Sequence, residues 1–285
     1  MPELPEVQTT VDGINKTVRG RKILDVKTTY NSSYHNGKDN VKNPKFFREF
    51  KKRVLGSKIL KASRRAKHVL IHLSSRETIL VHMKMTGHFV YDRPDYPFTR
   101  LYFVLDNKKI LSLSDMRKFA KVTLVKTENI EKSLHMEHLG PEPLEKIFDF
   151  NTFKSQILKR PKGKIKQVLL DQTLIAGIGN IYGDEILWRG LVNPLSTTGK
   201  IPLKNLKLMF KAMKETLTRG IELGGDSMSD YRNIKGERGK FQEHHMAYRQ
   251  TGKPCKKKGC EGIIQRTMVG MRSAHFCPVH QKLYL

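Results

Sequence analysis

The stretch VLIHLSSRETILVHM, residues 69–83, contains two short runs of β-branched and other apolar residues with polar residues between them. Similar runs recur at residues 101–105 and 122–125, and turn residues such as Asp106 and Asn107 separate them. Short strands divided by turns are typical of sandwiches and barrels. We therefore predict that residues 21–125 form a β-sandwich or a β-barrel.

A helix is predicted ahead of these strands, because apolar residues recur there at helical spacing. It should begin near Pro5, and its apolar face comprises Val7, Val11, Ile14 and Val18. A basic stretch follows at residues 38–58, and we expect it to include a short helix at residues 44–54.

The pattern changes after residue 138. The breaker-rich segment LGPEPL, residues 139–144, falls where the strand pattern stops, and residues 150–224 have helical periodicity. Residues 225–250 are polar and glycine-bearing and lack periodicity, which favours a mobile loop. We predict an α+β multidomain chain with divisions at residues 1–138, 145–225, 226–248 and 249–285.

The charge balance points to a polyanionic partner. Lys and Arg number 54 against 27 Asp and Glu, a formal net charge of +27, so nucleic acid is the first candidate and an anionic membrane surface the second. No run approaches about 18 apolar residues, which excludes a spanning helix, and no signal peptide is visible. Three cysteines are too few for a disulfide scaffold, so we expect a soluble protein of a reducing, intracellular compartment.

The first six residues, MPELPE, allow two interpretations. If Met1 is removed, Pro2 presents a secondary amine with a pKa of about 8. Such an amine can attack an electrophilic carbon and form an iminium ion, and Glu3 could move the protons that this chemistry requires. The alternative is structural, because proline and glutamate are also common at the start of a helix.

All three cysteines lie near the C-terminus, in the pattern Cys255-x4-Cys260-x16-Cys277-x2-His280. Three thiolates and an imidazole are a common ligand set for structural zinc, and glycine and proline stand beside the ligands as tight metal knuckles require. We predict one structural Zn²⁺ that holds a small basic hairpin carrying Arg266 and Arg272. The alternative is three incidental thiols and an unrelated surface histidine.

A glycine loop, AGIGN at residues 176–180, lies between two predicted helices, one at residues 164–172 and one from near Ile181. Backbone N–H groups and the Asn180 amide in such a loop can bind a phosphate. The loop is neither a Walker A motif nor a dinucleotide fingerprint. A simple tight turn is therefore the alternative.

Together these motifs resemble those of formamidopyrimidine-DNA glycosylases, a branch of the Fpg/Nei family. The resemblance covers the whole chain: PELPEV from Pro2, RRAK at residues 64–67, AGIGNIY from residue 176, FQE at residues 241–243 and the terminal finger. Leu4 favours this branch over the Nei type (endonuclease VIII), which usually carries glycine there. The implied fold is an N-terminal helix plus β-sandwich domain, a helix–two-turn–helix domain that binds DNA, a lesion-capping loop, and a zinc-finger β-hairpin.

The resemblance implies a bifunctional enzyme of base excision repair. It would excise 8-oxoguanine and formamidopyrimidines from damaged double-stranded DNA and nick the strand by β,δ-elimination. Pro2 would attack the sugar C1′ and Glu3 would donate the proton that opens the deoxyribose, with Glu6 supporting the same pocket. Lys67 would assist at phosphate and in β-elimination, and Arg272 would grip phosphate and assist δ-elimination. The residues alone leave open a generic phosphate contact for Lys67 and a helix cap for Glu6.

Three further residues, Met85, Arg117 and Phe119, match those that fill the gap left by an everted nucleotide. A side-chain wedge of this kind is a common device for unstacking a base step. Without the resemblance, Met85 and Phe119 would be assigned to the core, and Arg117 to the solvated surface.

Other DNA contacts are implied at His82, Lys162 and Asn180. The family often carries a histidine just before the third long strand, where this chain has Phe98, Thr99 and Arg100, so Arg100 is the candidate substitute.

The family finger usually has four cysteines, whereas His280 stands in the fourth position here. Histidine must be neutral to bind a metal. We therefore expect that zinc is still bound, but that zinc binding depends on pH differently than with four cysteines. The implied protein is a cytoplasmic, nucleoid-associated bacterial monomer without a membrane partner. Two rivals stay open: a Nei-type glycosylase for oxidised pyrimidines, and a non-enzymatic zinc-ribbon protein that binds nucleic acid.

Overall fold

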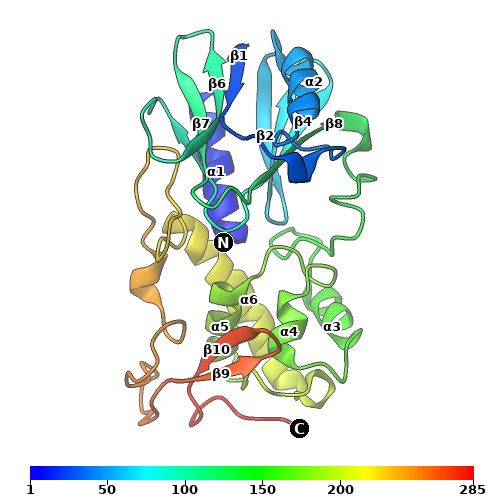
Figure 1. The fold of residues 1–285 in the computed structure, drawn as a ribbon. Coiled ribbons are helices and arrows are strands. Elements are labelled where there is room, and N and C mark those ends of the chain that lie inside the picture. Colours follow the sequence, from blue (N-terminus) through cyan, green and yellow to red (C-terminus); the bar gives the residue numbers. More distant parts are fainter. The chain divides into compact units, whose positions relative to one another are not determined.

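The N-terminal strands form two antiparallel four-stranded sheets, a sandwich rather than a barrel. The computed structural model describes residues 1–285 and divides into two compact units. The first unit comprises Met1–Glu137 and Leu223–Lys240, and the second comprises His138–Glu222 and Phe241–Leu285. Figure 1 shows the sandwich strands in blue to green.

Each sheet joins strands that are distant in sequence. One sheet has the order β1 (Ile23–Thr28), β6 (Thr99–Leu105), β7 (Ile110–Ser114) and β5 (His88–Tyr91). The other has the order β2 (Ile59–Arg65), β3 (His68–Leu73), β4 (Glu77–His82) and β8 (Lys121–Lys126). In β6, buried and half-buried residues alternate, so that Leu101, Phe103 and Leu105 enter the core.

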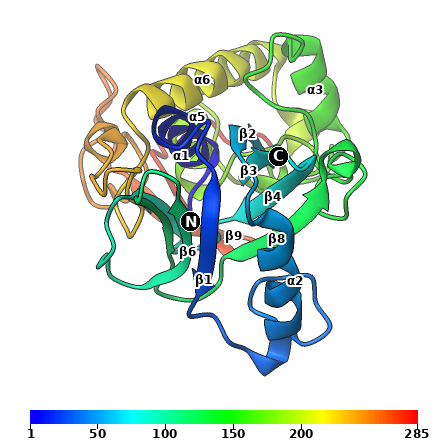
Figure 2. The ribbon, with the colours of Figure 1, turned by 90° about the horizontal axis from the view of Figure 1, so that it is seen from above.

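Two helices cover the open sides of the sandwich, and both were predicted. Helix α1 (Leu4–Thr17) packs against the edge strands β2 and β5, because its face from Val7 to Ile14 is buried. Helix α2 (Pro44–Val54) packs beside β1, and Val41 just before it donates its N–H to Val122 of β8. In Figures 1 and 2 the two helices lie apart. The sandwich is therefore closed along its edges.

The second unit is helical and ends in a hairpin. Its helices are α3 (Phe150–Leu158), α4 (Ile165–Leu170), α5 (Asn180–Arg189) and α6 (Leu203–Glu222). Strands β9 (Gln265–Val269) and β10 (Arg272–Phe276) form the antiparallel hairpin. The short 3₁₀ turns are η1 (Ser33–His35) and η2 (Thr127–Asn129) in the first unit, and η3 (Thr198–Lys200) and η4 (Phe241–His244) in the second.

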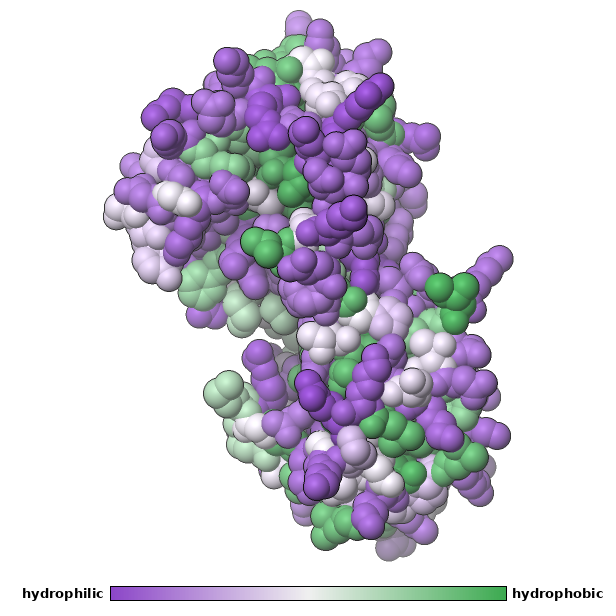
Figure 3. Space-filling view, turned by 90° about the vertical axis from the view of Figure 1, so that its right-hand side faces the viewer, coloured by the Kyte–Doolittle hydropathy of each residue, from purple (hydrophilic) through white to green (hydrophobic).

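The surface agrees with the charged composition. Hydrophilic side chains dominate both units in the view of Figure 3, and apolar ones are scattered among them. None of the helices combines the length and the apolar character needed to cross a membrane.

Candidate active site and metal centre

Two buried glutamates stand at the start of α1, directly after Pro2. Glu3 is the N-cap residue, and its side chain accepts the N–H of Glu6. In return the N–H of Glu3 donates to Oε2 of Glu6 (2.7 Å). This reciprocal capping box satisfies two N–H groups that the helix itself cannot pair. Glu6 therefore caps the helix, and the same contacts fix the carboxyl of Glu3, the residue that follows Pro2 in the chain.

Glu6 also holds a segment that is distant in sequence. Its Oε1 accepts the N–H of Asp226 (2.7 Å), and its backbone carbonyl accepts the hydroxyl of Tyr231 (3.0 Å). Gly225 has a φ of +84°, and a Cβ there would lie 2.9 Å from the side chain of Glu6. Glycine is therefore required both by the left-handed backbone and by the close approach to the carboxylate.

The segment at residues 223–240 has no helix or strand but is anchored to the first unit. Ile234 enters the sandwich core and its carbonyl accepts the N–H of Tyr91 (2.8 Å). The hydroxyl of Ser227 accepts the N–H of Gly239 (2.9 Å) and donates to the carbonyl of Tyr231 (2.9 Å). Ser227 thus joins the two ends of the proposed lesion-capping segment, and Ile234 fixes its middle to the sandwich.

Lys67 lies in the turn between β2 and β3, where its side chain is almost completely buried. Arg64 shapes this turn: its Nη1 donates to the carbonyl of Ala66 (3.0 Å) and its Nε to Gln8 of α1 (3.1 Å). Asn15 of α1 makes two further hydrogen bonds with the backbone of Ala62 in β2. The turn that carries Lys67 is therefore tied to the helix that begins after Pro2.

His82 ends β4, opposite His68 of β3 and Lys121 of β8. Burial is the main cause that lowers the pKa of His82 to about 2, and His68 and the nearby cations of Lys84, Lys67 and Lys121 act in the same direction. The N–H of Lys84 donates to Nδ1 of His82 (3.0 Å), which places the imidazole proton on Nε2. His82 is therefore a neutral donor, suited to a phosphate oxygen.

The depressed pKa of His82 predicts a loss of stability in acid. The unfolded chain binds this proton at about pH 6.5, so the free energy of unfolding should fall as pH drops from about 6.5 towards 2. His82→Asn retains an acceptor for the N–H of Lys84 and should reduce this slope by up to about 1.4 kcal/mol per pH unit. Urea unfolding between pH 7 and 5 measures it. His244→Asn, at an exposed position, is the control, and equal slopes for His82→Asn and the unsubstituted protein would contradict the assignment.

The three wedge candidates lie on the surface rather than in the core. Met85 is 39% exposed and Phe119 is 49% exposed. The guanidinium of Arg117, also exposed, lies 4.6 Å from the ring centroid of Phe119. Met85 and Phe119 are large apolar side chains in contact with water, so covering them with a ligand would be favourable. They are therefore suited to contact a ligand.

The glycine loop leads into α5, with Asn180 as the first helical residue. Gln172 holds the loop: its Oε1 accepts the N–H of Gly177 (2.9 Å) and its Nε2 donates to the carbonyl of Ile178 (2.8 Å). The side-chain oxygen of Asn180 is buried and has no hydrogen-bond partner. The loop is thus a tight turn, as the structural alternative held, and it also presents an amide at a helix N-terminus.

The remaining candidates lie on other elements of the chain. Arg272 begins β10 after the exposed turn at Gly270 and Met271, and Lys162 lies exposed between α3 and α4. Arg100, in β6, donates from Nε to the carbonyl of Asp115 (3.2 Å). Nε of Arg100 is therefore used in a hydrogen bond within the protein.

Two consecutive buried acids in α5 hold the C-terminal hairpin and the segment at residues 246–248 ahead of it. Asp184 binds Nζ of Lys166 (2.6 Å) through Oδ1, and through Oδ2 it accepts the N–H (3.0 Å) and contacts Nδ1 (2.9 Å) of His275 in β10. Glu185 accepts three successive backbone N–H groups, those of Met246, Ala247 and Tyr248. Neither acid was predicted from the sequence to have a role, although adjacent carboxylates on an apolar helix are an unusual pattern.

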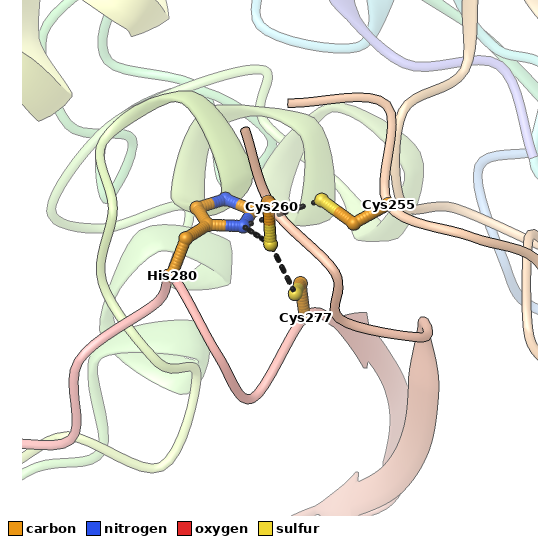
Figure 4. A group of neighbouring side chains, drawn as sticks. All are labelled: Cys255, Cys260, Cys277 and His280. Atoms are coloured by element: carbon orange, nitrogen blue, oxygen red, sulfur yellow. Dashed lines mark hydrogen bonds between the residues drawn. The ribbon is translucent and has the colours of Figure 1, made fainter. Parts of the chain in front are cut away.

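The three cysteines and His280 form one cluster, whose ligand atoms all lie within 4.8 Å of one another (Figure 4). Nδ1 of His280 lies 3.3 Å from Sγ of Cys255 and 3.7 Å from Sγ of Cys260, which is 3.6 Å from Sγ of Cys277. A tetrahedral Cys₃His zinc site needs about 3.8 Å between sulfurs and about 3.6 Å between sulfur and nitrogen. The residues therefore fit a four-ligand metal site, and the three thiols are not incidental.

The orientation of His280 is set from outside the cluster. Its Nε2 lies 3.2 Å from the carbonyl of Trp188, so the Nε2 proton is donated there and Nδ1 is left as the ligand atom. Burial is the main cause that lowers the pKa of His280, which favours the neutral form that binds a metal.

Two family models match the chain. Residues 1–122 match the formamidopyrimidine-DNA glycosylase N-terminal domain, and residues 139–232 match the formamidopyrimidine-DNA glycosylase H2TH domain. A formamidopyrimidine-DNA glycosylase of Pelotomaculum thermopropionicum is 36% identical over 286 residues, which cover 99% of this chain and 100% of the relative. One of Ligilactobacillus salivarius is 36% identical and covers 98% of both chains. The chain belongs to the formamidopyrimidine-DNA glycosylase family.

Solved structures of this glycosylase family share the fold. The Lactococcus lactis enzyme in complex with DNA containing an abasic site is 31% identical, with a TM-score of 0.87 over 98% of this chain and 99% of that one. The wild-type enzyme of the same species in complex with DNA containing N7-benzyl-Fapy-dG is 32% identical, with a TM-score of 0.86 over 99% of this chain and 100% of that one.

Proposed function

We propose that this chain is a bifunctional DNA glycosylase and AP lyase of base excision repair. It excises oxidised purines, 8-oxoguanine and formamidopyrimidines, from double-stranded DNA and then nicks the strand. The observation that carries the proposal is the placement of Pro2 directly before the buried, mutually capped pair Glu3 and Glu6, in a chain that belongs to this family.

The chemistry begins at the N-terminus after removal of Met1. The amine of Pro2 forms a bond to C1′ of the damaged nucleotide while the bond from C1′ to the base breaks, and the departing base takes up the proton that the proline nitrogen loses. The carboxylic acid of Glu3 gives its proton to the ring oxygen O4′, and the sugar opens as the iminium forms. Glu6 keeps Glu3 in place through the capping box, so it is a positioning residue.

Strand cleavage follows from the iminium, which makes the sugar's C2′ proton acidic. Loss of that proton expels the 3′ phosphate, and a second elimination expels the 5′ phosphate. We assign a phosphate-binding role in the first elimination to Lys67, and in the second to Arg272. Both are cations that can stabilise a leaving phosphate.

DNA binding must also extract the damaged nucleotide from the stack, at a cost of a few kcal/mol. We assign the filling of the gap to Met85 and Phe119, and contact with the orphaned base to Arg117. Phosphate contacts are assigned to His82, Arg100, Lys162 and Asn180. The net charge of +27 supplies the general attraction, so binding should weaken steeply with salt.

The metal is proposed to be one structural Zn²⁺ held by Cys255, Cys260, Cys277 and His280. When bound, it supplies rigidity rather than catalysis, because four protein ligands leave no open position. It would hold the hairpin that carries Arg272. We further propose that the protein works as a cytoplasmic monomer.

Loss of one metal ligand should greatly reduce strand cleavage. His280→Ala should lower the zinc content from one ion per chain to near zero and greatly reduce incision, because a hairpin this small cannot fold without its metal. His280→Cys retains four ligands and is the matched control, expected to keep both. Metal analysis and an incision assay measure the two effects. A chelated, metal-free protein with full incision activity would refute the structural role.

Borohydride reduction tests the proposed function as a whole. In the presence of duplex DNA containing 8-oxoguanine it should convert the iminium to a stable amine, giving a covalent protein–DNA adduct. The same duplex with undamaged guanine should give none, and thymine glycol should give less. Absence of an adduct with both lesions would refute the proposal. A preference for thymine glycol would indicate that the substrates are oxidised pyrimidines.

A further inference from the structure

Asp115 is a completely buried carboxylate at the base of the segment that carries Arg117 and Phe119. Its Oδ1 accepts the hydroxyl of Thr86 (2.7 Å). Its Oδ2 accepts the hydroxyl of Tyr30 (2.8 Å) and the backbone N–H of Ala120 (2.8 Å). Three donors therefore compensate the buried charge.

These contacts close the exposed segment 116–119 at both ends. Asp115 precedes the segment and Ala120 follows it, and one side chain joins the two positions. The N–H of Asp115 also donates to the carbonyl of Phe98 (2.9 Å), which ties the segment to the residue just before β6. The segment is therefore held at both ends by buried contacts, while its own residues are exposed.

Thr86 extends the network to the second wedge segment. Its hydroxyl donates to Asp115 and accepts the backbone N–H of Arg117 (3.0 Å). Thr86 is the neighbour of Met85 in a tight turn closed by a hydrogen bond from the N–H of Gly87 to the carbonyl of Met83 (3.0 Å). A single hydroxyl thus links the segment of Met85 to that of Arg117 and Phe119.

We propose that Asp115 is a positioning residue that, through Thr86 and Ala120, holds Met85, Arg117 and Phe119 at fixed relative positions before DNA binds. The inference rests on the proposed wedge role of those three residues. Side chains that are already ordered lose less conformational freedom when they enter the stack, so eversion of the nucleotide becomes easier. No contact between Asp115 and DNA is required.

The hydrogen bonds of the site favour a carboxylate. All three partners of Asp115 donate to it, and a carboxylate only accepts. In Asp115→Asn one oxygen becomes an NH₂ group, which can pair with Thr86 only if that hydroxyl turns to accept, so the hydroxyl proton of Thr86 loses its acceptor. The substitution changes one atom and almost no volume, and therefore tests the hydrogen bonds rather than the packing.

The first test compares a duplex lesion with an abasic site in a single strand. Asp115→Asn should slow single-turnover excision of 8-oxoguanine from duplex DNA by about 10²-fold, the order expected when a contact is misplaced by about 1 Å. Nicking of a preformed abasic site in a single-stranded oligonucleotide should change less than about 3-fold, because no stack has to be filled there. An equal loss on both substrates would overturn the proposal, since it would indicate a general defect.

The second test is a double-mutant cycle with Phe119→Ala. If Asp115 acts through the wedge, Asp115→Asn should slow excision less in the Phe119→Ala variant than in the unsubstituted protein, whereas independent effects would multiply. Multiplying effects would overturn the positioning role. If Phe119→Ala is impaired and Asp115→Asn is not, the inference fails while the proposed function stands. If neither Phe119→Ala nor Arg117→Ala is impaired, the wedge assignment itself fails.

Thr86→Val keeps the proposal testable if Asp115→Asn does not fold. It replaces the linking hydroxyl by a methyl of similar size and should reduce duplex excision by about tenfold, again without affecting the single-stranded substrate. Tyr30→Phe removes a partner of Asp115 that lies in neither wedge segment, and it should stay within about 3-fold of normal excision. Normal excision by Thr86→Val beside an impaired Phe119→Ala would overturn the inference.

Discussion

A chain with one extra residue ahead of Pro2 will bind damaged duplex DNA but form no covalent adduct on borohydride reduction. Its rate of base excision should fall by at least about 10³-fold. The added residue converts the proline nitrogen into an amide, whose lone pair is delocalised into the carbonyl and cannot attack C1′. Glu3, Lys67 and Arg272 are unchanged, so only the nucleophile is lost.

A matched pair of proteins makes this experiment clean. Protease cleavage of two fusions yields one chain that begins at Pro2 and one that begins with a glycine before Pro2. Affinity for lesion DNA, the trapped adduct and single-turnover excision are measured for both. Equal excision by the two proteins would show that the N-terminal amine is not the nucleophile. A mass spectrum of an active preparation that retains Met1 would lead to the same conclusion.

Glu3→Gln should separate base excision from strand cleavage. We expect excision of 8-oxoguanine to fall by about 10²–10⁴-fold, the usual contribution of a general acid. Cleavage at a preformed abasic site should change less than about tenfold, because the free aldehyde of that sugar needs no proton to open its ring. Gel assays on the two substrates measure both rates, and equal losses would remove Glu3 from the role of proton donor.

Glu6→Gln is the informative counterpart to Glu3→Gln. The glutamine oxygen at residue 3 can still accept the N–H of Glu6, so Glu3→Gln should fold normally. The two oxygens of Glu6 accept separate backbone N–H groups, those of Glu3 and Asp226. An amide cannot accept at both positions, so Glu6→Gln should lose about 1–3 kcal/mol of stability. It should slow base excision and cleavage at a preformed abasic site to the same extent.

Local patterns in the sequence predicted much of the fold. The helix expected at residues 44–54 is α2, with Asn43 as its cap, and the helix near Pro5 is α1. The strand runs at residues 69–73 and 101–105 fall within β3 and β6. These features were accessible because helix periodicity, capping residues and strand alternation all act over a few residues.

The metal cluster was predicted for a different reason. Chemistry restricts a buried group of three thiols and an imidazole to very few roles, so the residue types and spacing of Cys255 to His280 were sufficient. The roles of Pro2, Lys67, Arg272 and the DNA contacts came from family resemblance and stay predictions.

The sequence by itself determined the element types, a domain of short strands that is either a sandwich or a barrel, the metal ligands and the electrostatic preference for a polyanion. Only the tertiary structure revealed that Glu6 holds Asp226, that Asp184 holds the hairpin and Glu185 the segment at residues 246–248, and that Asp115 joins two surface segments. Each of these contacts joins residues between 29 and 220 positions apart. A lone acid in a basic chain looks like any solvated charge until folding removes its water and the backbone N–H and hydroxyl groups of distant segments replace it.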